Sequence, residues 1–447
     1  MDEDLAPLHT YLENLGHSTA KPRTRAFVLY LELKGQHHRR LAEHGLAEAV
    51  SLAAALPNID VLGADVVRLA KANPAMLLGS GKVNDFKQIF TADKIELVLV
   101  DGTLSPVQQR NLEKEWGVKI LDRTGLILEI FADRARTREG VMQVELAALT
   151  YQRTRLVRAW THLERQRGGL GFVGGPGETQ IESDRRAIDD QVVRIKRQLG
   201  KVVKTRELHR AARRKVPFPV VALVGYTNAG KSSLFNRMTG AEVLAKDMLF
   251  ATLDPTMRGV TLTDGRKVIL SDTVGFISDL PTELVAAFRA TLEEVLAADL
   301  IIHVRDISHP ETAEQSADVI DILTSLGVKD TTSQIEVWNK LDLVNDGTAL
   351  NLREQADKSD HTFAVSAFNG QGIDGLVNAI STVFDQAKFT SSISLPFDQG
   401  RAYAWLHAQN IIQTENQDDL GWQFTLLWTP RQEKGFFSLT GIAAANG

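Results

Sequence analysis

The first 135 residues alternate between short apolar runs and segments with helical spacing. A short apolar run bounded by polar residues predicts a buried strand, whereas apolar residues repeated every three or four positions predict a helix. Strands and helices that alternate in this way are typical of an α/β domain, which we expect at residues 1–135. The expected strands are Ala26–Leu33, Ile95–Val100 and Lys119–Leu121, and the expected helices are Leu46–Leu56 and Pro106–Trp116.

The helical spacing then becomes continuous and predicts two long helices at residues 136–215. Thr179 and Glu182 match a capping box, so we expect the second helix to begin there and to run to about Arg214, a length of roughly 54 Å. The segment from Gly168 to Gly177 is rich in glycine and would form the tip loop of a long antiparallel helical hairpin. The apolar positions are Val141, Val144, Ala148 and Tyr151 in the first helix, and Ile181, Ile188, Val192, Ile195, Leu199 and Val202 in the second.

Two further parts follow the hairpin. A second α/β pattern begins at Val220 and predicts a mostly parallel sheet with helices on both faces at residues 216–388. Residues 389–447 predict a small α+β domain. Its three tryptophans are expected to be core residues more than a platform for base stacking, and they are Trp405, Trp422 and Trp428.

Charge is distributed unevenly along the chain, although the net charge is only −5. Residues 151–215 hold 17 Lys or Arg and 7 Asp or Glu, a net charge of +10, and the rest of the chain carries −15. A local concentration of positive charge favours a polyanion such as RNA, because phosphate contacts release counterions. The alternative is a solvated helix face with many arginines, and charge alone does not separate the two.

The composition excludes several classes of protein. With no cysteine, the chain has no disulfide, no thiolate nucleophile and no cysteine-bound metal. The start MDEDLAPLHT lacks the basic and apolar segments of a signal peptide, and no uninterrupted apolar run approaches the length of a membrane span. We therefore expect a cytoplasmic protein without a membrane span.

The segment Gly225–Ser233, GYTNAGKSS, matches the phosphate-loop pattern G-x-x-x-x-G-K-S. It follows the apolar run Val220–Val224 and precedes a helix expected from Ser232 to Met238, which is the context that this motif requires. Lys231 would reach the β and γ phosphates of a nucleotide, and the Ser232 hydroxyl would bind Mg²⁺.

Three further motifs follow in the order that a guanine-nucleotide switch requires, each at the end of an expected strand. Asp272 of DTVG would hold Mg²⁺ through water, and the N–H group of Gly275 would contact the γ phosphate. In NKLD, the Asp342 carboxylate can accept from both N1–H and N2–H of guanine, while the stem of Lys340 lies along the base. A backbone N–H of the segment Ser366–Phe368 would donate to guanine O6. Adenine offers no such donor pair, so the motifs together indicate GTP.

The loop FATLDPT, Phe250–Thr256, is the expected sensor of the γ phosphate. Thr252 would contact this phosphate through Mg²⁺, and the loop would lose its order when the phosphate leaves. An ordinary turn residue is the alternative for Thr252. The expected catalytic residues are Lys231, Thr252 and Gly275.

Phe276 follows Gly275 at the position where many switch GTPases place the glutamine that orients the attacking water. A phenylalanine ring cannot hydrogen-bond water, so we expect slow intrinsic hydrolysis that a partner or another group near the γ phosphate accelerates. Asn228 could coordinate a K⁺ ion that adds positive charge at the transition state. A loop-stabilising asparagine is an equally good interpretation of Asn228.

The motif segments as a whole are expected to form the nucleotide site. The expected metal ligands are Ser232, Thr252 and Asp272. The expected nucleotide-binding residues are Gly225, Tyr226, Thr227, Asn228, Ala229, Gly230, Lys231, Ser232, Ser233, Phe250, Ala251, Thr252, Leu253, Asp254, Asp272, Thr273, Val274, Gly275, Asn339, Lys340, Leu341, Asp342, Ser366, Ala367 and Phe368.

With these motifs the chain resembles the HflX family of bacterial translational GTPases over most of its length. Outside the GTPase motifs, the resemblance includes GSGKV at Gly79–Val83, LDRTGLILEIFADRA at Leu121–Ala135 and GGLGFVGGPGETQIESDRR at Gly168–Arg186. It implies a P-loop GTPase domain with an N-terminal α/β domain, a helical hairpin and a small C-terminal domain. It also implies binding to the large ribosomal subunit, with dissociation of stalled or stressed ribosomes coupled to GTP. The hydrophobic Phe276 fits the family as well.

The ribosome would supply the polyanion that the basic hairpin suits. We hypothesise that the hairpin tip contacts rRNA, because glycines permit close approach of the backbone to phosphate and arginines flank them. A flexible connector is the alternative. The hypothetical RNA contacts are Arg165, Arg167, Gly168, Gly169, Gly171, Gly174, Gly175, Arg185 and Arg186.

Other functions share the same motifs. A GTP-gated RNA-binding or ribosome-assembly factor without splitting activity would use every GTPase residue named above. An RNA-remodelling ATPase would need a second phosphate loop, for which Gly79–Lys82 is the candidate. Val83 stands there in place of the required Ser or Thr, so we interpret this segment as a loop and the start of a helix. We expect the protein to be a monomer.

Overall fold

The computed structural model contains two compact units, Met1–Asp133 with Ala148–Asp189, and Arg134–Ala147 with Asp190–Gly447. The sequence-based division into four domains stays a prediction. The residues that the structure describes are 23–34, 40–166, 176–213, 218–241, 249–253, 255–278, 289–328, 332–385, 389–409, 411–418, 420–429, 432–433, 436–437, 440 and 445–446.

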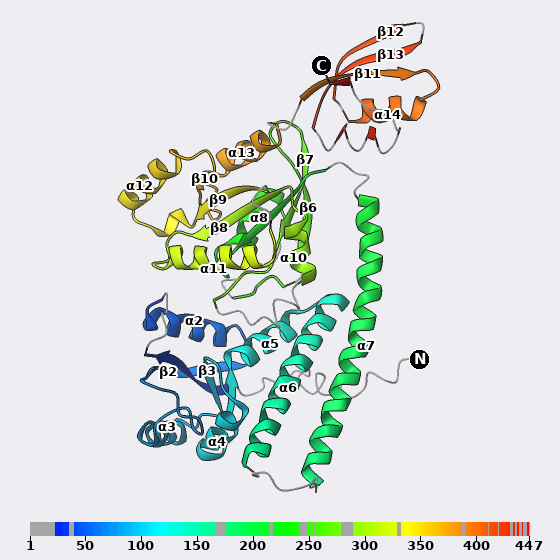
Figure 1. Ribbon diagram of the computed structural model, residues 1–447. Helices are drawn as coiled ribbons and strands as arrows, with labels where there is room; N and C mark the ends of the chain where they lie inside the picture. The colour runs from blue at the N-terminus through cyan, green and yellow to red at the C-terminus, as the bar shows by residue number, and fades with distance from the viewer. Residues whose placement is uncertain are drawn as a thin grey trace. The chain divides into compact units, whose positions relative to one another are not determined.

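A parallel four-stranded sheet in the order β2-β1-β3-β4 forms the centre of the N-terminal part (Figure 1). The expected strands and helices are all present within a few residues. β2 was not predicted, because it is an edge strand whose alternate residues are exposed, so that it lacks a continuous apolar run. The elements are β1 (Thr24–Leu33), α2 (Ala42–Ala54), β2 (Ile59–Leu69), α3 (Ser80–Ala92), β3 (Leu97–Asp101), α4 (Pro106–Trp116), β4 (Lys119–Asp122) and α5 (Arg123–Arg134).

An aromatic cluster packs α3 and α4 against this sheet. The rings of Phe86 and Phe90 stack with centroids 5.7 Å apart, and Trp116 meets Phe90 edge-on at 5.1 Å. The Trp116 indole also donates to the carbonyl oxygen of Val83 at 2.9 Å. Gly79 precedes the first residue of α3, so the GSGK segment is a loop and a helix start, as predicted.

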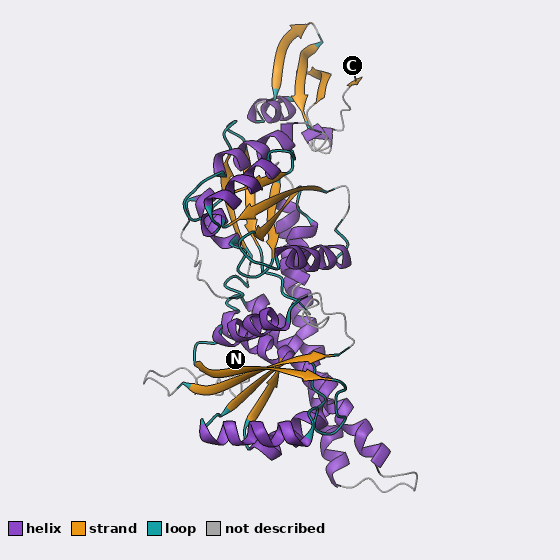
Figure 2. Ribbon diagram, turned by 90° about the vertical axis from the view of Figure 1, so that its left-hand side faces the viewer, coloured by secondary structure: helices purple, strands orange, loops and turns teal. Residues whose placement is uncertain are grey.

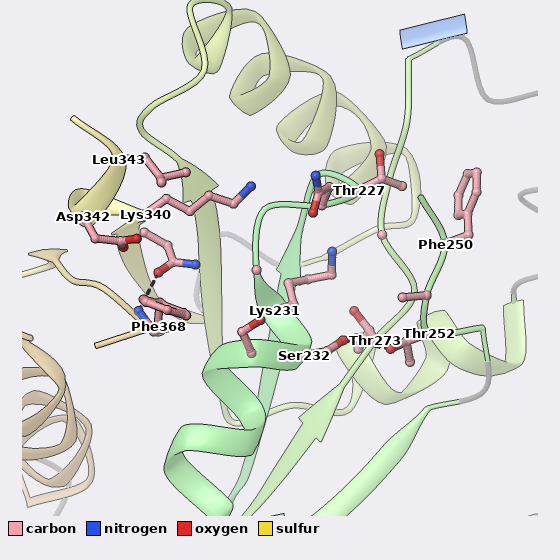
Figure 3. Close-up of a pocket in the computed structure, with 17 residues that line it drawn as sticks. Thr227, Lys231, Ser232, Phe250, Thr252, Thr273, Lys340, Asp342, Leu343 and Phe368 are labelled. Atoms are coloured by element: carbon pink, nitrogen blue, oxygen red, sulfur yellow. Dashed lines mark hydrogen bonds between the residues drawn. The ribbon is translucent and has the colours of Figure 1, made fainter. Parts of the chain in front are cut away.

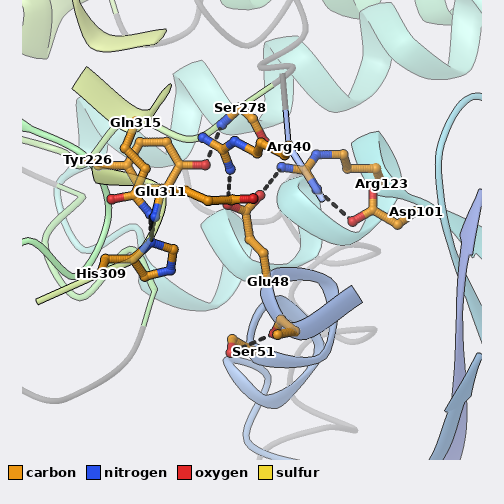
Figure 4. A network of polar contacts seen from close by, with 11 residues as sticks. Arg40, Glu48, Ser51, Asp101, Arg123, Tyr226, Ser278, His309, Glu311 and Gln315 are labelled. Carbon is orange, nitrogen blue, oxygen red and sulfur yellow. Dashed lines mark hydrogen bonds and ion pairs between the residues drawn. The ribbon is translucent and has the colours of Figure 1, made fainter. Parts of the chain in front are cut away.

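Buried ion pairs lie at the carboxyl end of β3 (Figure 4). The guanidinium of Arg123 donates to Asp101 Oδ2 at 2.6 Å and to Glu48 Oε1 at 2.7 Å, and all three side chains are about nine-tenths buried. Arg40 binds the other oxygen of Glu48 at 2.7 Å. Since each carboxylate has lost most of its water, the local structure depends on these cations.

Two long helices form the hairpin, α6 (Arg138–Gln166) and α7 (Pro176–Arg213). Val192 and Ile195 of the predicted seam are buried, and Arg153 pairs with Asp189 at 2.8 Å. The predicted start of the second helix was wrong, because α7 begins at Pro176 and includes Gly177. Proline is favoured in the first helical turn, where its missing N–H costs nothing. Among the described helices, none is long and apolar enough to cross a membrane.

The next sheet has six strands in the order β10-β9-β8-β5-β7-β6, and only the β6–β7 pair is antiparallel. Figure 2 shows helices on both sides of these strands. Side chains of α8 and α13 share one apolar cluster with one face of the sheet, and α10 and α11 contact its central strands outside that cluster. The mostly parallel sheet with helices on both faces is therefore confirmed. Its elements are β5 (Val220–Gly225), α8 (Lys231–Thr239), β6 (Thr256–Thr261), β7 (Lys267–Asp272), α10 (Arg289–Leu296), β8 (Leu300–Asp306), α11 (Thr312–Ser325), β9 (Ser333–Asn339), η1 (Leu341–Leu343), α12 (Asp346–Ala356), β10 (Thr362–Ala364) and α13 (Ile373–Asp385).

The C-terminal part is an antiparallel sheet in the order β12-β13-β11-β14 with one helix. Trp428 is fully buried against Phe436, whereas Trp405 and Trp422 are partly buried at the edge of the same core. The tryptophans are thus core residues, as predicted. The elements are β11 (Phe389–Pro396), α14 (Gly400–Ala408), β12 (Ile412–Asp418), β13 (Gly421–Trp428) and β14 (Ala445–Asn446).

The buried ion pairs lead to a prediction for Arg123. Arg123→Met leaves Asp101 and Glu48 buried with less compensating charge, which should lower the free energy of local opening by about 3–5 kcal/mol. Arg68→Met is the control, because the Arg68 side chain is 66% exposed beside Glu32 and its loss should cost at most about 1 kcal/mol. Hydrogen exchange of the β1 and β3 amides measures both. Equal costs for the two variants would contradict a structural role for the Arg123 pairs.

His303 gives a second prediction, on pH. Burial in β8 lowers the pKa of its imidazole from 6.5 to about 4, against the smaller opposing effect of Glu336. Unfolding therefore takes up a proton, and the free energy of unfolding should fall by up to about 3 kcal/mol as the pH drops from 6.5 to 4. His303→Gln should flatten this dependence, whereas His361→Gln, at an exposed position, should not. Urea unfolding at several pH values measures the slopes.

Candidate functional site

The loop between β5 and α8 curls around the N-terminus of α8. Gly230 has a φ of +90°, and a Cβ atom there would lie 2.2 Å from Asn339 Nδ2, so only glycine fits. Beside this loop lies a cavity of about 390 Å³ (Figure 3). Its lining residues are Thr227, Asn228, Gly230, Lys231, Ser232, Ser233, Phe250, Ala251, Thr252, Thr273, Gly275, Asn339, Lys340, Asp342, Leu343, Ala367 and Phe368.

The cavity brings together residues from all five sequence motifs. Leu343 is the one lining residue that sequence reasoning missed, and its place one residue after NKLD was the available signal. Asp254 lies outside the described residues. The remaining expected residues do not line the cavity but stand behind or beside it, and these are Gly225, Tyr226, Ala229, Leu253, Asp272, Val274, Leu341 and Ser366.

Tyr226 is a phosphate-loop residue that does not line the cavity. Its side chain is buried, and its hydroxyl accepts from the Ser278 N–H at 2.8 Å. The neighbouring Thr227 N–H donates to Phe276 O at 2.7 Å, and the Phe276 N–H donates to Gly225 O at 3.1 Å. Three hydrogen bonds therefore hold the phosphate loop to the segment after DTVG, which gives Tyr226 a structural position rather than one facing the cavity.

The three expected metal ligands converge at one point. Asp272 Oδ2 accepts from Ser232 Oγ at 2.7 Å and from Thr252 Oγ1 at 2.9 Å, and the two hydroxyl oxygens are 2.8 Å apart. Asp272 is fully buried, and burial raises the pKa of its carboxyl, although both hydroxyls and Lys231 act in the opposite direction. Its Oδ1 atom has no hydrogen-bond partner among the described residues.

This set of donors fits Mg²⁺. The ion prefers hard oxygen ligands, and a buried carboxylate with an unsatisfied oxygen gains most from a nearby cation. Within the described part of the chain there is no cluster of three His, Cys, Asp or Glu residues.

Lys231 lies at the centre of the phosphate end. Its ammonium group is buried and donates to the carbonyl oxygens of Tyr226 at 2.8 Å and Gly225 at 3.2 Å. Burial lowers the pKa of Lys231 to about 8, and Asp272 partly offsets this effect. A Cβ atom on Gly275 would lie 3.0 Å from Lys231 Nζ and 2.8 Å from Thr227 Cα, so the DTVG segment can approach the phosphate loop only because it has glycine there.

The opposite end of the cavity is organised by Asn339. Its amide nitrogen donates to Ala229 O in the phosphate loop at 2.9 Å, and its amide oxygen accepts from the Ala367 N–H at 2.9 Å. Asp342, exposed to the cavity, accepts from the Ser366 hydroxyl. Lys340 lines the cavity, and its ammonium group pairs with Asp306 at 2.8 Å.

Phe276 and Asn228 differ in their placement. The Phe276 ring is buried in the protein interior, so its side chain does not face the cavity. Asn228 lines the cavity and has a φ of +60°, a conformation that asparagine tolerates better than most residues. This geometry fits the loop-stabilising interpretation and leaves the side chain at the cavity.

The hypothetical RNA contacts are only partly described. Arg185 and Arg186 are exposed on α7, and Arg185 Nε lies 3.8 Å from Asp189. Arg165 belongs to α6, but its side chain is not described. The other predicted contacts lie outside the described residues, and they are Arg167, Gly168, Gly169, Gly171, Gly174 and Gly175.

Sequence models of known families match almost the whole chain. A family described as "50S ribosome-binding GTPase" matches residues 220–340, and "HflX C-terminal domain" matches residues 351–435. The models "GTP-binding GTPase N-terminal" and "GTP-binding GTPase Middle Region" match residues 43–132 and 134–213. Most of the residues that line the cavity lie within residues 220–340, the match to the ribosome-binding GTPase family, and the protein is a GTP hydrolase.

Individual relatives agree with these matches. "GTPase HflX" of Magnetococcus marinus is 48% identical over 393 residues, which cover 88% of this chain and 90% of the relative. "GTPase HflX" of Escherichia coli is 43% identical over 349 residues, which cover 78% and 81%. A crystal structure of a GTP-binding protein from Sulfolobus solfataricus in complex with GDP is 24% identical, with 80% and 98% covered and a TM-score of 0.44. On the strength of the sequence relatives, the chain belongs to the HflX family of GTPases.

Proposed function

We propose that this GTPase binds the large ribosomal subunit and couples GTP binding and hydrolysis to the dissociation or rescue of stalled or stressed ribosomes. The proposal that the protein binds GTP rests on the convergence of Ser232, Thr252 and Asp272 beside the buried Lys231. The family description "50S ribosome-binding GTPase" supports the ribosomal part. We place its action in the cytoplasm, where ribosomes are found.

The phosphates of GTP would lie along the loop between β5 and α8. Phosphate oxygens would replace the two carbonyls as acceptors for Lys231, and their negative charge would raise its pKa above about 8, so that it stays protonated. The Gly275 N–H would donate to the γ phosphate. Ser232, Thr252 and Asp272 would hold Mg²⁺, which supplies positive charge to the phosphates when bound.

Guanine would lie at the other end of the cavity. The Asp342 carboxylate would accept from N1–H and N2–H of the base, and the stem of Lys340 would cover one face of it. The Asp306 partner fixes the Lys340 ammonium and therefore the path of that stem. An adenine base would place an acceptor, N1, against Asp342, which explains the proposed preference for GTP.

The attacking water must be oriented by a group other than Phe276. The ring of Phe276 is buried and has no hydrogen-bonding atom, so we propose that the ribosomal partner supplies or positions the missing group. A K⁺ ion beside Asn228 is a second proposal for added positive charge, and the exposure of Asn228 to the cavity supports it.

A GTP-gated RNA-binding or ribosome-assembly factor without splitting activity is the competing function. The two proposed functions differ in whether the bound protein separates the subunits of an assembled ribosome. Splitting of assembled ribosomes by the protein with GTP or a non-hydrolysable analogue favours the dissociation factor. Binding to free subunits alone, with assembled ribosomes left intact, favours the assembly factor.

The missing glutamine predicts a partner-dependent rate. GTP turnover by the purified protein in potassium buffer should be on the order of 10⁻³ s⁻¹ or below and should rise at least about tenfold with large ribosomal subunits. Steady-state phosphate release measures both rates. Lys231→Ala is the control, since it should abolish the stimulated rate if the turnover belongs to this protein. A fast basal rate that is indifferent to subunits would contradict a ribosome-activated switch.

The basic hairpin predicts a salt-dependent contact. Replacing Arg185 and Arg186 together by Gln should weaken subunit binding and reduce the slope of log K against log salt by about 1–2, because each lost phosphate contact removes nearly one released counterion. Lys196→Gln with Arg197→Gln is the matched control, at exposed positions of the same helix farther from the hairpin tip. Binding to large subunits from 50 to 300 mM salt tests this, and unchanged binding of the first variant would exclude these arginines.

A further inference from the structure

Arg237 connects the helix after the phosphate loop to the loop that follows β10. It lies on α8, six residues after Lys231. Its Nε donates to Ala367 O at 3.1 Å, and one of its terminal nitrogens donates to Phe368 O. Arg237 does not line the cavity and belongs to none of the GTPase motifs.

Nearly all backbone N–H groups of the loop at residues 366–370 donate to an acceptor within the protein. Ser366 donates to Gln371 O at 2.9 Å, and Ala367 donates to Asn339 Oδ1 at 2.9 Å. Asn369 and Gly370 both donate to Ser366, to its hydroxyl at 3.2 Å and to its carbonyl at 2.9 Å. Among the described residues, the Phe368 N–H alone in this loop has no acceptor.

The direction of that N–H is set by Arg237. The Ala367 carbonyl and the Phe368 N–H belong to one planar peptide, and no peptide in the described chain is cis. In a trans peptide these two groups point in opposite directions. Because the carbonyl is bound to Arg237, the N–H must point away from Arg237, while both Ala367 and Phe368 line the cavity.

We propose that Arg237 is a positioning residue for guanine recognition, which fixes this peptide so that the Phe368 N–H donates to O6 of the base. The inference rests on the proposed binding of GTP and goes beyond it, because it assigns the positioning of the O6 donor to Arg237, a residue outside the motifs. Arginine suits this role, since its planar fork can bind two successive carbonyls at once, whereas lysine offers a single point of charge.

The arrangement also joins the two ends of the nucleotide. α8 carries Lys231 in its first turn and Arg237 about 9 Å farther along its axis, at about 1.5 Å per residue. The same rigid helix thus sets the positions of the phosphate contact and of the O6 donor. Without the Arg237 contacts, the loop after β10 would not hold the Phe368 N–H at a fixed distance from Lys231.

The test compares nucleotides that differ at O6. In 6-thio-GDP, sulfur, a weak acceptor, replaces O6, whereas IDP keeps O6 and lacks the N2 amino group. Arg237→Met should weaken GDP and IDP binding equally, by about tenfold, and 6-thio-GDP binding by less than about twofold, as expected for loss of one hydrogen bond. Arg237→Lys should give an intermediate loss. Arg258→Met, at an exposed position of β6, is the matched control and should change none of the three.

Binding is measured by calorimetry on the full chain, with thermal unfolding of each variant as the check on folding. An equal loss for GDP and 6-thio-GDP would show that Arg237 acts through general loop stability and would overturn the inference, as would full GDP affinity in Arg237→Met. Failure of the wild-type protein to prefer GDP over ADP would overturn the proposed guanine site itself, and the inference with it.

Discussion

The structure of the GTPase domain depends on a carboxylate that the fold has removed from water. Asp272 is the last residue of β7 and is fully buried. Its Oδ2 atom accepts from two hydroxyls, whereas its Oδ1 atom has no hydrogen-bond partner among the described residues. Such a group is costly unless a cation is near, and Lys231 is itself buried beside it. The elements around the cavity therefore converge on charges that a magnesium nucleotide would neutralise.

Hydrogen bonds make the rest of the cavity one unit. Asn339 joins the phosphate loop to the loop after β10, and Arg237 reaches that loop from α8. Tyr226 joins the phosphate loop to the segment after DTVG. Each contact connects two segments that are far apart in sequence, so the two ends of the cavity and the segment after DTVG are held together by side chains that do not all line the cavity.

Lys231 and Asp272 place buried charge at the cavity, whereas the residue after Gly275 is Phe276 and not a glutamine. Phe276 is packed in the interior and contributes its backbone to the hydrogen bonds around the phosphate loop. Under the proposed function, the partner supplies the group that orients the attacking water. The basic segment at residues 151–215, with a net charge of +10, provides a physical reason for an RNA-containing partner to be the source.

The sequence by itself determined the order of elements and most of the site, because buried parallel strands have long apolar runs and phosphate loops require glycine at fixed spacing. It did not reveal β2, an edge strand with alternating exposure, and it placed the start of α7 three residues too late. Tertiary structure alone decided which motif residues face the cavity, since burial of Tyr226 and Phe276 depends on strands that pair across the sheet. It also decided the contacts of Arg237, because a hydrogen bond between residues 130 positions apart leaves no local pattern in the sequence.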